Sequence, residues 1–264
     1  AVWAILKGIK LPDWRYFEGT PTRRIKGKFD ELQSIRKFRE SIPDWMDETC
    51  EAELGKRWDV EIKELNKQAR VILRTNTLKT TRKELQKLLQ DEEVFSEFVP
   101  QAPDALVLVE RKNVFITQAF KNGLFEVQDA SSQLVAAFLD VKPGQKVIDT
   151  CAGAGGKTLH LASLMENKGQ IIAMDIYAHK LAELKKRAKR DGAHNIETRP
   201  IEGSKSIKKF KGKADRVLID APCSGIGVLK RNPDSKWKLN ADFLDRIRKT
   251  QAEILDQYAS MVKD

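Results

Sequence analysis

The feature that most constrains the fold is a glycine-rich segment, DTCAGAGGKT at residues 149–158, which lies between an apolar run and an amphipathic run. Residues 146–151 have the pattern of a buried strand and residues 157–165 that of a helix, so the glycines fall at a turn between them. The alternation continues downstream, with strands expected at residues 170–176, 196–201 and 216–220 and a helix at residues 178–191. Strands that alternate with helices predict a doubly wound α/β domain with a parallel sheet.

The glycine-rich turn predicts a nucleotide-type site. Gly153, Gly155 and Gly156 would let backbone approach a ligand closely at the carboxyl end of the sheet. Two known loop patterns fail here by one residue each. A P-loop requires Gly at the position of Cys151, and the dinucleotide fingerprint requires Gly or Ala at the position of Thr158.

Acidic residues follow the next two strands. Asp175 lies twenty residues beyond Gly155, where a carboxylate can accept hydrogen bonds from the ribose hydroxyls of a cofactor. The alternative is that Asp175 caps the helix that begins after Tyr177. Glu202, after the third strand, is a weaker candidate for contact with an adenine edge.

The segment DAPCSGIG at residues 220–227 follows the last expected strand and places Asp220 and Cys223 beside the glycine turn. A pyrimidine resists methylation at carbon-5 until a thiolate adds to carbon-6, and an acid or hydrogen-bond partner at N3 assists that addition. One cysteine and one aspartate suit this chemistry. The alternative is a free cysteine that only fills a loop.

The first half of the chain is expected to hold two smaller parts. Residues 1–66 form a helical lead-in, with helices predicted at residues 29–41 and 46–54. Residues 67–124 form a small α/β module with a strand at 71–78, a helix at 80–93 and a strand pair at 105–109 and 114–117. The module has the size of an RNA-recognition fold but lacks an aromatic run for stacking bases. Residues 125–264 form the glycine-loop domain.

Charge favours a polyanionic partner. The 264-residue chain carries a formal net charge of +10, and residues 180–213 hold twelve Lys or Arg against four Asp or Glu. Such a field suits RNA phosphates, although a solvated helix face would look the same. With 41% hydrophobic and 33% charged residues, the chain is expected to be neither membrane-spanning nor disordered.

Cysteine usage indicates a reducing compartment. Cys50, Cys151 and Cys223 are odd in number and never form a C-x-x-C pair, which argues against a disulfide framework and a zinc site. The three histidines have no metal spacing, so no metal is expected. We expect a cytoplasmic monomer.

Three motifs in order give the chain a family resemblance. VQDASS at residues 127–132, DTCAGAGGK at 149–157, and DAPCSGIG at 220–227 with RNPD at 231–234 resemble the Sun/RsmB-type family of RNA cytosine carbon-5 methyltransferases. The resemblance spans roughly residue 42 to the end and implies a Rossmann-like class I methyltransferase domain with S-adenosylmethionine as cofactor. It implies an RNA substrate, ribosomal RNA first and transfer RNA as the alternative.

The resemblance also assigns residues. Asp175 would hold the cofactor ribose, Glu202 would lie near the adenine, Asp220 would face the methyl group and the target base, and Lys157 would help order the active site. Cys223 would assist release of the product. The cofactor would be wrapped by Cys151, Ala152, Gly153, Ala154, Gly155, Gly156 and Lys157.

One departure from the family pattern leaves alternatives open. The family's attacking thiolate comes from a later Thr-Cys-Ser-type motif, whereas this sequence ends at Asp264 after a helix expected at residues 241–262. We expect the methyltransferase domain to be incomplete here, with its C-terminal strands missing. One alternative makes Cys223 the nucleophile, as in DNA cytosine methyltransferases. Another is a fragment that binds RNA and cofactor without turnover.

Overall fold

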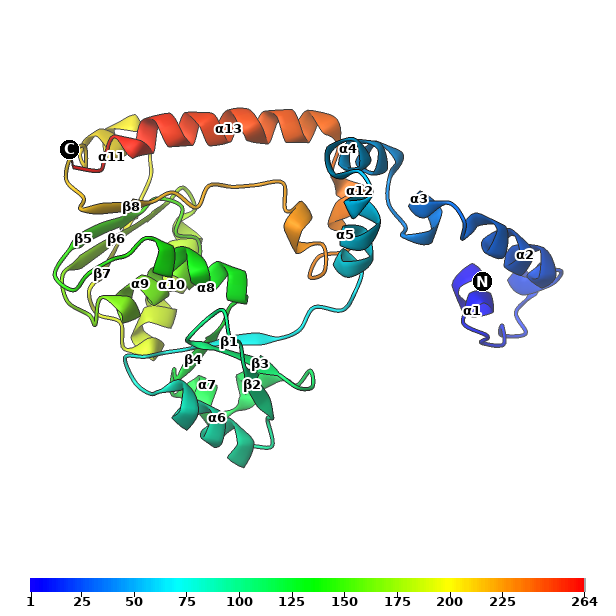
Figure 1. Ribbon diagram of the computed structural model, residues 1–264, viewed down its shortest axis with the longest axis horizontal. Helices are drawn as coiled ribbons and strands as arrows, with labels where there is room; N and C mark the ends of the chain where they lie inside the picture. The colour runs from blue at the N-terminus through cyan, green and yellow to red at the C-terminus, as the bar shows by residue number, and fades with distance from the viewer. Residues whose placement is uncertain (264) are drawn as a thin grey trace. The chain divides into compact units, whose positions relative to one another are not determined.

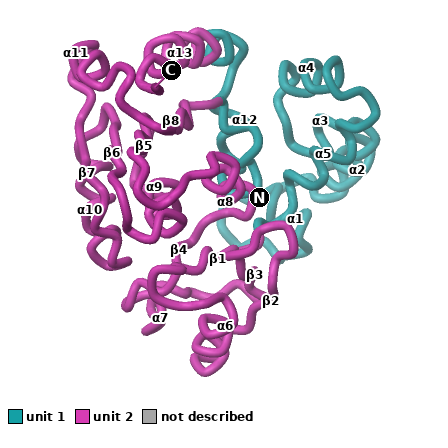
Figure 2. Tube along the Cα trace, turned by 60° about the vertical axis from the view of Figure 1, so that its left-hand side comes forward, with its two compact units in different colours: residues 1–69, 224–245 teal, residues 70–223, 246–264 magenta. Residues whose placement is uncertain are grey.

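The computed structural model describes residues 1–263, which form two compact units (Figures 1 and 2). Unit 1 comprises residues 1–69 and 224–245, and unit 2 comprises residues 70–223 and 246–264. None of the helices within residues 1–263 is both long and apolar enough to cross a bilayer. The glycine loop and the predicted site residues all belong to unit 2.

Unit 1 is helical. Its core is formed by Met46, Trp58 and Ile62, which pack with Ile42 and Leu229. The elements are α1 (Val2–Leu6), η1 (Arg15–Phe17), α2 (Thr22–Leu32), α3 (Arg36–Arg39), α4 (Asp44–Leu54), α5 (Arg57–Leu65), η3 (Ile226–Val228) and α12 (Ser235–Lys238).

The two helices predicted in this unit have different outcomes. Helix α4 confirms the helix expected at 46–54, and it ends at Gly55, whose φ of 54° is left-handed. The single helix expected at 29–41 is wrong, because the chain forms α2 and α3 with a break between them. At the break Ser34 donates its hydroxyl to the Glu31 carbonyl, and Ile35 is extended.

The first sheet of unit 2 is antiparallel, with strand order β2-β3-β1-β4. Helix α6 begins with a capping box between Thr81 and Glu84, and its Leu85 and Leu89 pack with Leu73 of β1. The elements are β1 (Ile72–Thr75), α6 (Arg82–Asp91), β2 (Ser96–Phe98), β3 (Ala105–Leu108), η2 (Val114–Ile116), α7 (Gln118–Lys121) and β4 (Phe125–Val127).

Part of the predicted strand pattern is wrong in this sheet. Residues 114–117 do not pair with residues 105–109; they form η2, where the Asn113 side chain accepts from the Phe115 amide. Both edges of β3 are taken by β1 and β2. Residues 125–127, which were expected to begin the following domain, form β4, and this strand pairs with β1. The domain boundaries at residues 66 and 124 remain predictions.

The second sheet is parallel, with strand order β7-β6-β5-β8, as the alternation of strands and helices predicted. This order matches four strands of the Rossmann arrangement. The elements are α8 (Ala130–Phe138), β5 (Lys146–Asp149), α9 (Gly156–Leu164), β6 (Gln170–Asp175), α10 (Ala178–Asp191), β7 (Ile196–Pro200), α11 (Ser204–Lys208), β8 (Arg216–Leu218) and α13 (Ala241–Ala259).

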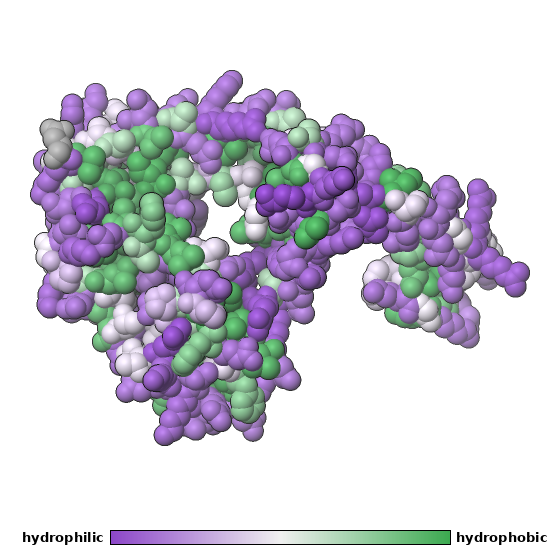
Figure 3. Space-filling model, viewed as in Figure 1, coloured by the Kyte–Doolittle hydropathy of each residue, from purple (hydrophilic) through white to green (hydrophobic). Residues whose placement is uncertain are grey.

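Both faces of the parallel sheet are covered by helices. Val147 and Ile171 pack into a core with residues of α8, α9 and α10. Their neighbours Ile148 and Ile172 pack on the other face with Tyr258 of α13. In Figure 3 hydrophobic residues gather where α13 runs beside the parallel strands. The doubly wound fold class is therefore confirmed, and the carboxyl ends of β5, β6 and β8 meet at one edge.

Candidate cofactor and catalytic site

A pocket of about 250 Å³ lies at the carboxyl ends of β5, β6 and β8. It brings together Cys151, Gly153, Asp175 and Asp220, four residues predicted from three separate motifs. Its other walls are Thr150, Ile176, Tyr177, Lys180, Pro222, Ile254 and Tyr258. Open parallel sheets bind ligands at this edge, so the fold places the predicted residues where a cofactor can bind.

Asp175 connects the glycine loop to the start of α10. One carboxylate oxygen accepts from the Gly153 amide at 2.8 Å, and the other accepts from the Tyr177 amide at 2.8 Å. The capping alternative is wrong, because the N-cap of α10 is Tyr177 and no side chain caps the helix there; Asp175 binds the Tyr177 amide ahead of the helix and lines the pocket. Asp175 fixes the loop backbone from the pocket side.

Gly155 is required by the packing of the loop. Its φ is 91°, and a Cβ there would lie 2.5 Å from Cγ of Leu184 on α10. The glycine therefore allows the loop to approach α10 closely. At Gly153 the φ is 56°, but a Cβ would meet nothing within 4 Å.

Asp149, at the end of β5, is a buried carboxyl beneath the loop. Its Oδ2 accepts from the Thr158 hydroxyl at 2.7 Å, and its Oδ1 has no hydrogen-bond partner within residues 1–263. Burial raises the pKa of Asp149 to about 7. The carboxyl is thus held partly protonated near neutral pH.

Asp220 and Lys157 form an ion pair at the rim of the pocket. The Lys157 Nζ lies 2.5 Å from Asp220 Oδ2, and the aspartate side chain is 45% exposed. This pair joins the start of α9 to the loop after β8. A carboxylate that is fixed by a lysine and still open to solvent can hydrogen-bond or exchange a proton with a substrate.

Seven predicted site residues do not line this pocket, and two of them, Glu202 and Cys223, lie outside the glycine loop. Glu202 is exposed, and its backbone amide contacts the Ser206 hydroxyl at 3.3 Å. Cys223 is also exposed and directly follows Pro222, which lines the pocket. The remaining loop residues belong to the glycine turn and the first turn of α9 without lining the pocket: Ala152, Ala154, Gly155, Gly156 and Lys157.

Cys151 is a poor nucleophile in this setting. Burial, reinforced by the charges of Asp149, Asp175 and Asp220, raises the pKa of its thiol to about 11. The thiolate is the reactive form of cysteine, so Cys151 is neutral at physiological pH. Cys223, by contrast, is exposed.

Among the pocket-lining residues that were not predicted from the sequence are Tyr177, Lys180, Ile254 and Tyr258. Tyr177 and Lys180 open α10, where the lysine ammonium lies 4.5 Å from the tyrosine ring centroid. Their position after Asp175 was the available signal. Ile254 and Tyr258 come from α13. Their four-residue spacing predicts that they share one face of the helix, but it does not predict which pocket that face covers.

The residues present fit S-adenosylmethionine. Asp175 and Asp220 supply acceptors for ribose hydroxyls and an ammonium group, and both favour a positively charged sulfonium nearby. Ile176 and Ile254 supply apolar walls for a base. Among residues 1–263 no cluster of His, Cys, Asp or Glu could hold a metal ion.

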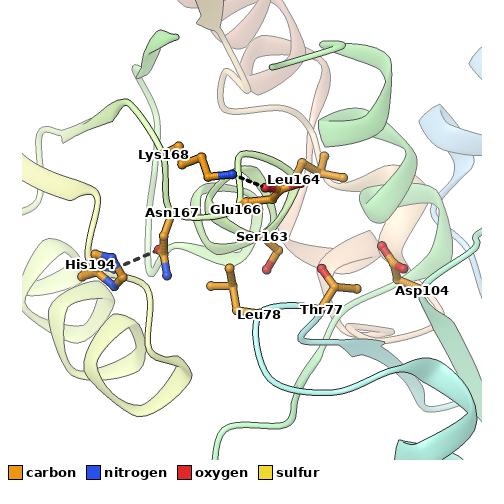
Figure 4. A pocket seen from close by; sticks show the side chains of 9 residues that line it. All are labelled: Thr77, Leu78, Asp104, Ser163, Leu164, Glu166, Asn167, Lys168 and His194. Atoms are coloured by element: carbon orange, nitrogen blue, oxygen red, sulfur yellow. Dashed lines mark hydrogen bonds and ion pairs between the residues drawn. The ribbon is translucent and has the colours of Figure 1, made fainter. Parts of the chain in front are cut away.

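A second, larger pocket of about 750 Å³ lies at the opposite edge of the parallel sheet (Figure 4). It is lined by an ion pair between Lys168 and Glu166, just before β6 begins. Asn167 there accepts from the His194 amide at 3.1 Å. It contains no predicted site residue. Because cofactors of such sheets bind at carboxyl ends, this pocket is not the cofactor site.

Two family models match the chain. Residues 136–264 match the model described as 16S rRNA methyltransferase RsmB/F, and residues 42–115 match the ferredoxin-like domain of RsmF/B-like methyltransferases. The probable ribosomal RNA small subunit methyltransferase B of Bacillus subtilis is similar, at 38% identity over 72% of this chain and 43% of its own length. The chain spans about half the length of the curated relatives it matches.

Solved structures agree with this match. A protein named PH0851 has a TM-score of 0.83 at 32% identity, covering 89% of this chain and 53% of its own. A methyltransferase homolog from Pyrococcus horikoshii has a TM-score of 0.74 at 28% identity, covering 90% of this chain and 73% of its own. With the motifs, both sheets and the cofactor pocket in agreement, the chain belongs to the Sun/RsmB-type family of S-adenosylmethionine-dependent methyltransferases.

Proposed function

We propose that the protein carrying this chain transfers a methyl group to carbon-5 of a cytosine in small-subunit ribosomal RNA. The observation that supports this most is the pocket at the carboxyl ends of β5, β6 and β8, where the cofactor loop, Asp175 and the Lys157–Asp220 pair meet. The names of similar proteins specify small-subunit ribosomal RNA. The net charge of +10 suits an RNA substrate.

The proposed chemistry gives each residue a distinct role. Bound S-adenosylmethionine would supply an electrophilic methyl group. Asp220, in its protonated form, would donate a proton to cytosine N3 as a thiolate adds to carbon-6 and would take the proton back when the thiolate leaves, and Lys157 would hold Asp220 in place. After methylation, a base would remove the carbon-5 proton, and the carbon–sulfur bond would break to release the product and the thiolate. The target base would be flipped out or single-stranded.

The source of the thiolate separates two versions of this proposal. In the family pattern it comes from a later Thr-Cys-Ser motif, and Cys223 assists product release. The alternative makes Cys223 the nucleophile, which its exposure beside Pro222 favours. Cys223→Ser distinguishes them. Slowed release with a trapped covalent RNA adduct supports the first version, and complete loss of covalent capture supports the second.

The direct test is methyl transfer from labelled S-adenosylmethionine to small-subunit ribosomal RNA and, in parallel, to transfer RNA. The RNA is then digested to nucleosides and analysed by mass spectrometry. We expect the label in 5-methylcytidine from ribosomal RNA. Label in a methylated guanosine would contradict the proposal, as would label confined to protein. Cofactor and RNA binding without any transfer would support the alternative of a binding fragment.

A further inference from the structure

The glycine loop is held from behind as well as from the pocket. Two carbonyls of the loop region, two residues apart, accept from guanidinium groups. Arg187 of α10 donates Nη1 to the Ala154 carbonyl at 2.7 Å, and Arg74 of β1 donates Nη1 to the Gly156 carbonyl at 2.5 Å. One of these two arginines therefore comes from the antiparallel sheet.

Arg74 is a buried charge in an unusual setting. The side chain is 1% exposed, and its second partner is the Gln128 side-chain oxygen at 2.5 Å. Its Nε has no hydrogen-bond partner in the described chain, and no carboxylate pairs with it directly there. A buried guanidinium bound to neutral carbonyls is weak as a stabilising device, so its placement calls for another explanation.

Arg187 is tied to the same antiparallel sheet through Glu126 of β4. The Glu126 carboxylate accepts from Arg187 Nη2 at 2.7 Å and also pairs with Arg190. The Glu126 side chain is 5% exposed. Both guanidinium contacts to the loop are therefore anchored, directly or through one residue, on the antiparallel sheet.

Hydrogen bonds that fix the Ala154 and Gly156 carbonyls also fix the direction of the N–H group in the same peptide unit. Because a peptide unit is planar, the Gly156 carbonyl sets the direction of the Lys157 amide. That amide belongs to the first turn of α9, where backbone N–H groups lack helical partners and can meet a ligand. The back of the loop thus controls which way its donors point.

We propose that Arg74 and Arg187 are positioning residues for the cofactor loop, and that the antiparallel sheet is through them a working part of the cofactor site. The inference rests on the cofactor assignment and is independent of which base is methylated. It predicts that the affinity for the cofactor depends on the hydrogen bonds from these arginines to the loop carbonyls, although the arginines themselves do not contact the cofactor.

Arg187 and Arg190 provide a matched pair for the test. They lie on the same helix, both pair with Glu126, and their side chains are 20% and 22% exposed. Only Arg187 contacts the loop carbonyl among the described contacts; Arg190 instead bonds Asp191 and lies over the Phe120 ring. Arg187→Met and Arg190→Met thus each remove one positive charge beside Glu126, but only Arg187→Met removes a hydrogen bond to the loop.

The experiment is calorimetric titration of each variant with S-adenosylhomocysteine, beside thermal unfolding and amide hydrogen exchange of residues 152–160. We expect Arg187→Met to raise the dissociation constant about tenfold or more, with faster exchange in the loop, because it loses a charge-assisted hydrogen bond. Arg190→Met should lower the melting temperature similarly and leave the dissociation constant within about twofold. Arg187→Lys should recover part of the affinity.

Equal changes in affinity for the two methionine variants would overturn the inference, because they would reflect general destabilisation. An unchanged affinity in Arg187→Met would also overturn it. A wild-type protein that does not bind S-adenosylhomocysteine would instead refute the cofactor site itself. The two failures are therefore distinguishable.

Discussion

The two sides of the cofactor loop have opposite charge. The pocket side carries the carboxyl groups of Asp175 and Asp220, and the carboxyl of Asp149 is buried beneath the loop, whereas the back carries the guanidinium groups of Arg74 and Arg187. Asp175 binds amides, Asp220 remains open to a ligand and Asp149 binds a hydroxyl, while the arginines bind carbonyls. The loop backbone is thus oriented from both sides, and the comparison predicts that chemistry depends on the acidic side and loop geometry on both.

The largest effect should come from Asp220, the acid open to substrate. Asp220→Asn keeps the shape of the side chain but removes the charge that pairs with Lys157. We expect methyl transfer to fall about 10²–10⁴-fold, the range for a lost acid or base group. Single-turnover rates with labelled cofactor would measure this. A loss smaller than about threefold would show that Asp220 takes no part in the chemistry.

Asp149 should make the acidic side sensitive to pH. Burial raises its pKa in the folded protein to about 7 from the ordinary value of 3.8, so the stabilisation that it contributes is fully present below pH 3.8. This stabilisation is lost as the pH rises towards 7. Asp149→Asn cannot lose a proton. As the pH rises, the free energy of unfolding of the variant should therefore increase relative to that of the wild type, by at most about 1.4 kcal/mol per pH unit.

Urea unfolding of both proteins between pH 4 and pH 8 would check this prediction. Burial also raises the pKa of Asp191 to about 7. Asp191 is present in both proteins, so its contribution cancels in the difference. A constant difference across this range would show that the pKa of Asp149 is not raised in the folded state.

Asp175 should affect cofactor binding more than any exposed acid. Asp175→Asn places an amide where two backbone N–H groups need acceptors. We expect S-adenosylhomocysteine to bind about 10- to 100-fold more weakly, as for loss of a hydrogen bond to a charged group. Glu202→Gln is the control, since Glu202 lies outside the pocket. Equal weakening in both variants would restore Glu202 as a cofactor residue.

The smallest effect is expected in a comparison of Gly153 and Gly155, the two glycines of the cofactor loop that have a positive φ. Gly155→Ala forces a Cβ against Leu184, and we expect a loss of about 1–3 kcal/mol in the free energy of unfolding. Gly153→Ala meets open space and should lose only about 1 kcal/mol for its φ. Urea unfolding compares the two. A larger loss at Gly153 would mean that close packing against α10 does not explain the loop.

The parallel sheet was predictable because its signals are local. Strands β5, β6 and β8 each contain a short apolar run bounded by a turn or a charged helix, and α10 has the predicted bounds. The antiparallel sheet was harder. Its three-residue strands β2 and β4 carry little pattern, and residues 114–117 are apolar enough for a strand but follow a capping asparagine.

The site was predictable where the chain order of motifs coincides with the carboxyl ends of strands, as for Cys151, Asp175 and Asp220. It was not predictable where distant segments meet. Tyr258 reaches the pocket from α13, and Arg74 reaches the Gly156 carbonyl across 82 residues of sequence. Neither position differs in sequence from an ordinary core tyrosine or strand arginine.

The most direct test of the account is a crystal structure with S-adenosylhomocysteine bound. We expect the ligand in the pocket between Asp175 and Asp220, with the Ala154 and Gly156 carbonyls still bound by Arg187 and Arg74. A ligand in the larger pocket beside Asn167 and His194, or a loop that leaves both arginines on binding, would contradict it.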